Sequence, residues 1–157
     1  MNGYVLGIDV GTTSVKAVLV SKEGIVDEAT AYHDLLSPYP NWAEENADVW
    51  WKNIKTAVSE ITGRHPDKAN DIAAIGCSGM VPAIVLLDQN GEPIRNTIQQ
   101  NDARAITQIE RIKNAIDQEK LFQRTGGTTN QQHILPRLLW VKENEPEAWE
   151  KIEKTMG

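Results

Sequence analysis

The sequence of 157 residues has little cysteine, with Cys77 alone, and it has no excess of basic residues. A single cysteine cannot form an internal disulfide, which is compatible with a reducing compartment. There are 16 lysines and arginines against 22 aspartates and glutamates, for a net charge of −6. Nucleic acid and anionic membranes both select a basic surface, so we exclude them as partners.

Long hydrophobic runs are also missing. No apolar stretch approaches the ~20 residues that a membrane helix needs. Asp9 and Lys16 interrupt the amino-terminal apolar stretch too early for a signal peptide. We therefore expect a soluble, cytoplasmic protein. Its composition, 40% apolar and 24% charged, is typical of a globular chain, and its length fits one ordinary domain with a buried core.

Hydrophobic periodicity predicts an α/β protein with a mixed sheet, early antiparallel hairpin strands and flanking helices. The predicted strands cover residues 4–9, 15–20, 25–29, 72–77 and 83–87, and the predicted helices cover residues 47–63, 103–114, 135–142 and 146–154. The segment 33–46 carries two prolines and is predicted to be a loop. No strand is expected after the last helix, so we expect the chain to be part of a longer protein.

The stretch GIDVGTTSVKAVLV, from Gly7 to Val20, interrupts two apolar strands with a polar turn. It contains neither the G-x-x-x-x-G-K-[ST] nor the G-x-G-x-x-G pattern, which excludes a P-loop and the dinucleotide fingerprint. Such a turn can still direct backbone N–H groups at an anion, while a carboxylate at a strand end suits Mg²⁺ and a lysine suits a phosphate oxygen. The candidate phosphate-binding residues are Asp9, Gly11, Thr12, Thr13 and Lys16, with Asp9 also the candidate metal ligand. These residue types are common in ordinary hairpin turns, and that interpretation stays open.

Four stretches occur in an order that resembles the FGGY carbohydrate kinases, closest to their xylulokinase-like branch. They are DVGTTSVK (Asp9–Lys16), NWAEENADVWW (Asn41–Trp51), IGCSGMVPAIVLLDQNGEPIRNTIQQNDAR (Ile75–Arg104) and TGGTTNQQHILPRLLWVKENEPEAW (Thr125–Trp149). The resemblance implies a ribonuclease-H-like fold of the actin and hexokinase group, with ATP and Mg²⁺ as cofactors and a sugar or polyol as substrate.

The same resemblance implies a domain organisation. Residues 1–157 would form most of the amino-terminal, sugar-binding domain, and the rest of that domain and the carboxy-terminal nucleotide domain would be absent. The family's catalytic base is an aspartate, which would follow Gly157. No residue of this chain is therefore predicted to be catalytic.

Two amide-rich loops and a proline-containing turn carry the residues that the resemblance places against a sugar. They are Val81, Pro82, Gln100, Asn101, Asp102 and Gln132. Amide groups donate and accept hydrogen bonds, as polyol recognition requires, and a solvated loop is the alternative interpretation. Val81 and Pro82 depart from the pattern, because xylulokinases have Met-His there and glycerol kinases have Arg-Glu. Since polar contacts set specificity, we predict a sugar or polyol kinase without assigning its sugar.

The predicted function is transfer of the γ-phosphate of ATP to a hydroxyl of a ketose, polyol or sugar acid. Two alternatives stay open, namely a non-kinase actin-like ATPase and a non-catalytic domain that binds a sugar or a partner protein. A homodimer also stays open. His33, His65 and His133 are too scattered in the sequence for a metal cage, and Cys77 is expected to be a small core residue.

Overall fold

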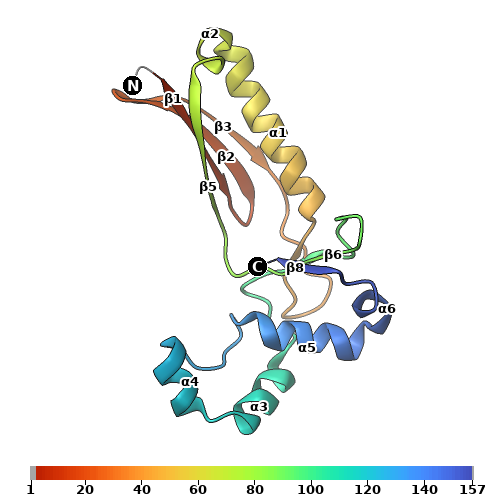
Figure 1. Ribbon diagram of the computed structural model, residues 1–157. Helices are drawn as coiled ribbons and strands as arrows, with labels where there is room; N and C mark the ends of the chain where they lie inside the picture. Colours follow the sequence, from red (N-terminus) through yellow and green to blue (C-terminus); the bar gives the residue numbers. More distant parts are fainter. Residues whose placement is uncertain (1–2, 157) are drawn as a thin grey trace. The chain divides into compact units, whose positions relative to one another are not determined.

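The computed structural model describes residues 3–156, which form two compact units. Unit 1 consists of residues 3–35 and 47–80, and unit 2 consists of residues 36–46 and 81–156. The polypeptide leaves unit 1 after residue 35, returns at residue 47 and leaves it again after residue 80 (Figure 1). Within residues 3–156, no helix is long and apolar enough to cross a membrane.

Unit 1 is built on a four-stranded mixed sheet with the strand order β3-β2-β1-β5. Its strands are β1 (Tyr4–Val10), β2 (Ser14–Ser21), β3 (Gly24–Tyr32) and β5 (Ile72–Gly79). The first three are joined as antiparallel hairpins, whereas β5 runs parallel to β1. A parallel neighbour requires a crossover connection, and α1 (Ala47–Arg64) followed by the short α2 (Pro66–Ala69) provides it.

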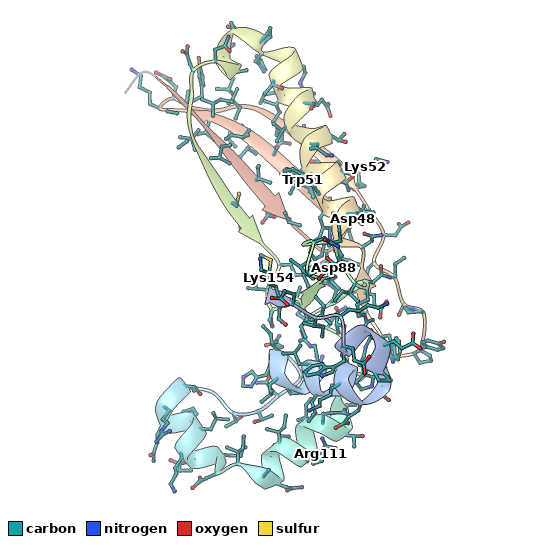
Figure 2. All side chains as sticks on the ribbon, turned by 45° about the vertical axis from the view of Figure 1, so that its right-hand side comes forward. Asp48, Trp51, Lys52, Asp88, Arg111 and Lys154 are labelled. Atoms are coloured by element: carbon teal, nitrogen blue, oxygen red, sulfur yellow. The ribbon has the colours of Figure 1, made fainter. Side chains whose placement is uncertain are left out.

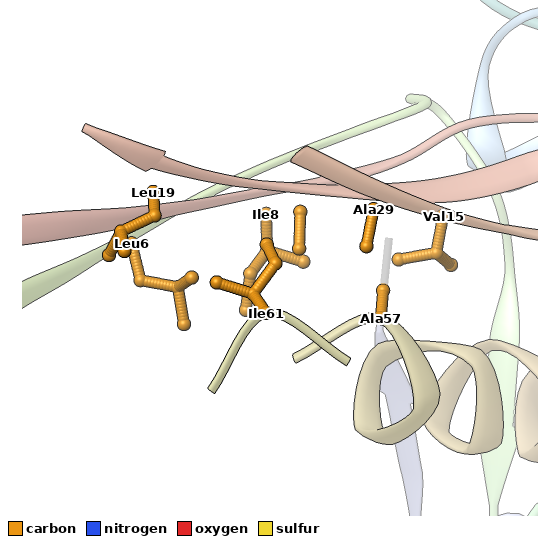
Figure 3. Close-up of a cluster of buried hydrophobic side chains, with 8 residues drawn as sticks. Leu6, Ile8, Val15, Leu19, Ala29, Ala57 and Ile61 are labelled. Atoms are coloured by element: carbon orange, nitrogen blue, oxygen red, sulfur yellow. The ribbon is translucent and has the colours of Figure 1, made fainter. Parts of the chain in front are cut away.

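The core of unit 1 lies between α1 and one face of the sheet (Figure 3). Side chains alternate along a strand, so β1 turns Leu6 and Ile8 toward α1 and turns Asp9 to the other face. On α1, Ala57 and Ile61 are one turn apart and are fully buried against the sheet. The buried residues of this cluster are Leu6, Ile8, Val15, Ala17, Leu19, Ala29, Ala57 and Ile61.

Unit 2 combines short antiparallel strands with helices. The strands are β4 (Glu44–Glu45), β6 (Val85–Leu87), β7 (Thr97–Ile98) and β8 (Lys154–Met156), with β4 paired to β7 and β6 paired to β8. The helices are α3 (Ile106–Ala115), α4 (Gln118–Thr125), α5 (Ile134–Asn144) and α6 (Pro146–Trp149). Val141 of α5 packs with Ile84, Leu86 and Ile98 in the buried cluster of this unit.

The mixed sheet, its early hairpins and the long helix after residue 46 are confirmed. The predicted helix over residues 146–154 is wrong beyond Trp149, where α6 ends. The chain then forms β8, and the Glu153 N–H donates to the Leu87 carbonyl oxygen at 2.9 Å. The expectation that no strand follows the last helix is therefore also wrong, because β6 pairs with the residues that follow α6.

The prediction that Cys77 lies in the core is wrong as well. Cys77 is exposed, because β5 forms an edge of the sheet and all its side chains after Ile72 are exposed. The helix α1 packs mainly against β2 and β3 instead. Together with Ile75 and with Trp51 of α1, Cys77 lines an apolar hollow of about 610 Å³ within unit 1.

Candidate functional site

The polar turn at the end of β1 forms a tight hairpin into β2. The Gly11 N–H donates to the Ser14 carbonyl oxygen at 2.9 Å, and a Cβ atom on Gly11 would come within 3.2 Å of that oxygen. Glycine at this position keeps the turn closed without a steric conflict. Because the Gly11 amide already serves the turn, an anion bound here would be held by the other groups of the hairpin.

Asp9 and Lys16 are direct partners in the β1–β2 ladder. Residues opposite each other in an antiparallel pair place their side chains on the same face of the sheet. For this pair it is the face opposite to α1, and both residues are exposed there. The Lys16 Nζ lies 3.9 Å from the Glu28 carboxylate in a solvent-exposed ion pair, which holds the ammonium only weakly. The hairpin thus presents a carboxylate and an ammonium next to each other.

The two threonines of the turn have different surroundings. The Thr12 hydroxyl donates to the Met80 Sδ at 3.0 Å, and the Met80 N–H donates to the Val10 carbonyl oxygen at 2.9 Å. These contacts join the turn to the residue that follows β5. Thr13 is exposed, and its carbonyl oxygen accepts the His33 N–H at 3.0 Å. All five candidate phosphate-binding residues therefore gather at one end of the unit 1 sheet.

Asp9 fits a magnesium ion that is shared with a bound phosphate. Mg²⁺ is usually bound by one or two carboxylates, several waters and the phosphates of the substrate, rather than by a cage of protein ligands. Asp9 supplies one exposed carboxylate at a strand end. Among residues 3–156, no group of three or more histidine, cysteine or acidic side chains is arranged to hold a metal ion by itself.

The candidate sugar-binding residues all lie in unit 2, and their exposure differs. Val81 is 68% exposed, Asn101 and Gln132 are exposed, and Pro82 and Gln100 are half-buried. These five residues lie on the connections before β6, after β7 and before α5. Their side chains are therefore carried by loops, as binding residues often are.

Asp102 differs from the other candidates because its carboxylate is fully buried. One oxygen accepts the Ala43 N–H at 2.6 Å and the Arg104 Nη2 at 2.7 Å, and the other accepts the Arg104 backbone N–H and Nε, each at 2.9 Å. The geometry supports a structural role, in which Asp102 ties the loop after β7 to the segment before β4. Direct contact between Asp102 and a sugar stays a prediction.

Trp42 and Glu44, in the segment just before α1, take part in the same buried network. The Arg104 guanidinium stacks on the Trp42 ring, 3.7 Å from its centroid, and lies 4.9 Å from the centroid of the Trp140 ring. Glu44 pairs with Arg104 at 2.7 Å and also with Arg95. Burial lowers the pKa of the Arg95 guanidinium, and the nearby glutamates oppose this effect. Trp42 and Glu44 therefore organise the loops of unit 2.

Arg137 is a residue that the sequence analysis missed. It lies on α5 with 1% of its surface exposed, and its guanidinium donates to backbone carbonyl oxygens of Pro82, Gln100 and Gln131. Burial lowers the pKa of this guanidinium, and the Asp102 carboxylate opposes the shift. The sequence did contain a signal for this role. Arg137 is a charged residue one helical turn before Val141, so it lies on the inward face of the helix.

Comparison with known proteins adds to this geometry. Residues 4–157 match the N-terminal domain of the FGGY family of carbohydrate kinases. The chain belongs to this family. It is 30% identical over 154 residues to a xylulose kinase of Lactococcus lactis subsp. lactis (strain IL1403), covering 98% of this chain and 30% of that protein. It is also 30% identical over 158 residues to a gluconokinase of Bacillus licheniformis, covering 100% of this chain and 30% of that protein.

A solved structure, the xylulose kinase from Rhodospirillum rubrum, superposes on this FGGY chain with a TM-score of 0.91 at 34% sequence identity. The match covers 98% of this chain and 32% of that one. The predicted family and the α/β fold class are therefore confirmed. The chain spans about 30% of the length of the curated relatives described above.

Proposed function

We propose that this chain is the amino-terminal, sugar-binding part of a kinase that transfers the γ-phosphate of ATP to a hydroxyl of a ketose, polyol or sugar acid. The observation that carries the proposal is the family match over residues 4–157. The hairpin of unit 1 and the loops of unit 2 supply the two kinds of group that such a reaction needs, donors for phosphate and donors and acceptors for hydroxyls.

In this proposal the hairpin serves the phosphate side. Lys16 meets a phosphate oxygen with its ammonium, and Thr13 adds a hydroxyl donor from the exposed side of the turn. Asp9 would hold Mg²⁺ directly or through water, and the ion would neutralise charge that develops on the transferring group. Phosphoryl transfer depends mostly on positioning and electrostatic stabilisation, so a tight hairpin that presents a carboxylate beside an ammonium suits it.

The loops of unit 2 serve the acceptor. Gln100, Asn101 and Gln132 can each donate and accept, which matches the hydroxyls of a polyol. Val81 and Pro82 provide no polar side-chain group, so the acceptor differs in its contacts there from one that is read by Met-His or Arg-Glu. The xylulose kinase of Lactococcus lactis and the gluconokinase of Bacillus licheniformis are each 30% identical to this chain. We therefore keep the acceptor at the level of a class.

A full-length protein is needed for the reaction. The base that removes the acceptor proton is proposed to be an aspartate outside this chain, in the rest of the same domain, and the adenine is proposed to bind in a second domain. Proximity of the acceptor hydroxyl, the γ-phosphate and the base then supplies much of the rate. Cytoplasmic location belongs to the same proposal, and assembly into a homodimer stays open.

Replacement of Asp9 tests the phosphate side. In the full-length kinase, Asp9→Asn is expected to lower kcat by about 10²–10³-fold or more, because an electrostatic contact to the transferring group is lost. The matched control is Asp67→Asn, since Asp67 lies in α2 of the same unit with 75% of its side chain exposed. ADP release is measured by a coupled assay against a panel of ketoses, polyols and sugar acids.

Three outcomes would contradict the proposal. Normal turnover in a folded Asp9→Asn protein would remove the hairpin from the phosphate site. ATP hydrolysis that no sugar stimulates would favour an actin-like ATPase, and sugar binding without any ADP release would favour a non-catalytic binding domain.

A further inference from the structure

Arg137 contacts the three loop segments that carry the candidate sugar-binding residues. Its Nη1 donates to the Pro82 carbonyl oxygen at 3.0 Å. Its Nη2 donates to the Gln131 carbonyl oxygen at 2.7 Å and to the Gln100 carbonyl oxygen at 3.4 Å, and its Nε reaches the Gln131 oxygen at 3.2 Å. Each nitrogen of the guanidinium thus binds backbone of a loop, and all of these loops belong to unit 2.

These contacts fix the course of the backbone rather than the identity of a side chain. Every acceptor is a main-chain carbonyl, so the side chains of Gln100 and of the neighbouring Val81, Asn101 and Gln132 stay available for other contacts. An arginine suits this task because its planar fork carries five N–H donors in fixed directions. A lysine has one nitrogen and cannot point donors along separate edges of a plane.

Packing alone does not account for a charged group at this position. Val141 already anchors α5 in the apolar cluster, with Ile134 and Leu138 packed against it. A buried charge carries a desolvation cost that an apolar side chain of similar volume avoids. The guanidinium therefore contributes through the geometry of its hydrogen bonds, and that geometry converges on the candidate binding loops.

We propose that Arg137 is a positioning residue for the sugar pocket, which holds the loops at Pro82, Gln100 and Gln131 in the arrangement that binds the acceptor. The acceptor in this statement rests on the proposed kinase function. The positioning itself concerns unit 2 alone, so it is measured without any activity.

The first experiment is hydrogen exchange on the 157-residue chain. In Arg137→Met, which removes all five donors but keeps an unbranched side chain, amide exchange in residues 81–84, 99–103 and 130–133 is expected to rise about tenfold or more, because loops held by few contacts open more often. Arg137→Lys retains the charge and part of the hydrogen bonding, so its effect should be intermediate. Exchange in α1 should not change in either variant.

The matched control is Arg111→Met. Arg111 lies on α3 of the same unit (Figure 2). Its side chain is 56% exposed and forms an ion pair with Glu143. This control removes a guanidinium of the same kind from the surface, and we expect no change in exchange in the three loop segments.

The second experiment measures steady-state kinetics of the full-length kinase with D-xylulose and with D-gluconate as probes. Arg137→Met is expected to raise the KM for the accepted sugar about tenfold or more, because binding loops lose their preset geometry, while the KM for ATP stays within about twofold. In Arg137→Lys, the KM for the sugar should lie between the values of the wild type and of Arg137→Met. A purely structural role would reduce the number of active molecules and lower kcat with both KM values unchanged.

In Arg137→Met, a rise in amide exchange that is equal across unit 2, or no rise in the three loop segments, would overturn the proposal. A fall in kcat with an unchanged KM for the sugar would also overturn it. If Arg137→Met does not fold, Arg137→Lys decides by the same loop-selective criterion. If the wild type turns over neither sugar, the proposed function fails for these acceptors, and the exchange result still decides the role of Arg137.

Discussion

At the scale of single residues, a substitution of the buried Asp102 tests whether this residue has a structural role or binds the sugar. Asp102→Asn keeps the shape of the side chain but removes one of the two carboxylates, Asp102 and Glu44, that pair with the Arg104 guanidinium. Removing one partner of a buried ion pair costs about 3–5 kcal/mol, so we expect unit 2 to lose stability by roughly this amount. Urea unfolding followed by tryptophan fluorescence measures the change, because Trp42 stacks on Arg104.

The control for Asp102 is Glu110→Gln. Glu110 forms a 2.9 Å ion pair with Lys113 on α3, with 60% of its side chain exposed, and such pairs contribute about 0–1 kcal/mol. If Asp102→Asn were as stable as Glu110→Gln, the buried network would not hold the loop. A direct contact to the sugar would then be the better explanation for an aspartate at this position.

At the scale of secondary-structure elements, α1 is held on the sheet by its buried stripe. Ile61 is fully buried in the cluster that Figure 3 shows, where it points from α1 toward the strands. Ile61→Ala is expected to destabilise unit 1 by about 2–5 kcal/mol, since it removes buried methyl groups and leaves a cavity. The loss is measured by urea unfolding and by faster amide exchange in β1 and β2.

Ile25→Ala is the matched control for Ile61, because Ile25 lies on β3 with 69% of its surface exposed. Its replacement should change the free energy of unfolding by no more than about 0.5 kcal/mol. Equal losses in the two variants would mean that the packing of α1 contributes little to the stability of the sheet.

At the scale of the whole molecule, the 157-residue chain alone is expected to release no ADP in response to sugar. In the proposed function, the hairpin binds phosphate and the loops bind the acceptor, while the aspartate base and the adenine site are both proposed to lie outside this chain. Closure of one domain on another, which expels water and completes many kinase sites, also needs the second domain. A coupled ADP-release assay with Mg²⁺, ATP and the sugar panel tests this expectation. Sugar-stimulated turnover by this chain alone would show that the base lies within it.

The agreement between sequence and structure is best where a local pattern carries the information. The apolar runs at residues 4–9 and 15–20 predicted β1 and β2, and the spacing on residues 47–63 predicted α1 to within one residue of its end. The polar turn at Gly11 was visible as an interruption between two strands. These features depend on side-chain period and on turn chemistry, which neighbouring residues set among themselves.

Tertiary structure decided the features that depend on partners far away in the sequence. β8 replaces the expected end of a helix because β6 offers it an edge, and Cys77 is exposed because β5 is an edge of the sheet. The sequence by itself determined the fold class, the family and the position of the polar hairpin at Gly11, through motifs that each occupy one short stretch. It did not reveal that Asp102 is buried or that Arg137 binds three loops. Those roles arise only when segments distant in the sequence meet, and no local period encodes which carbonyl a buried guanidinium will reach.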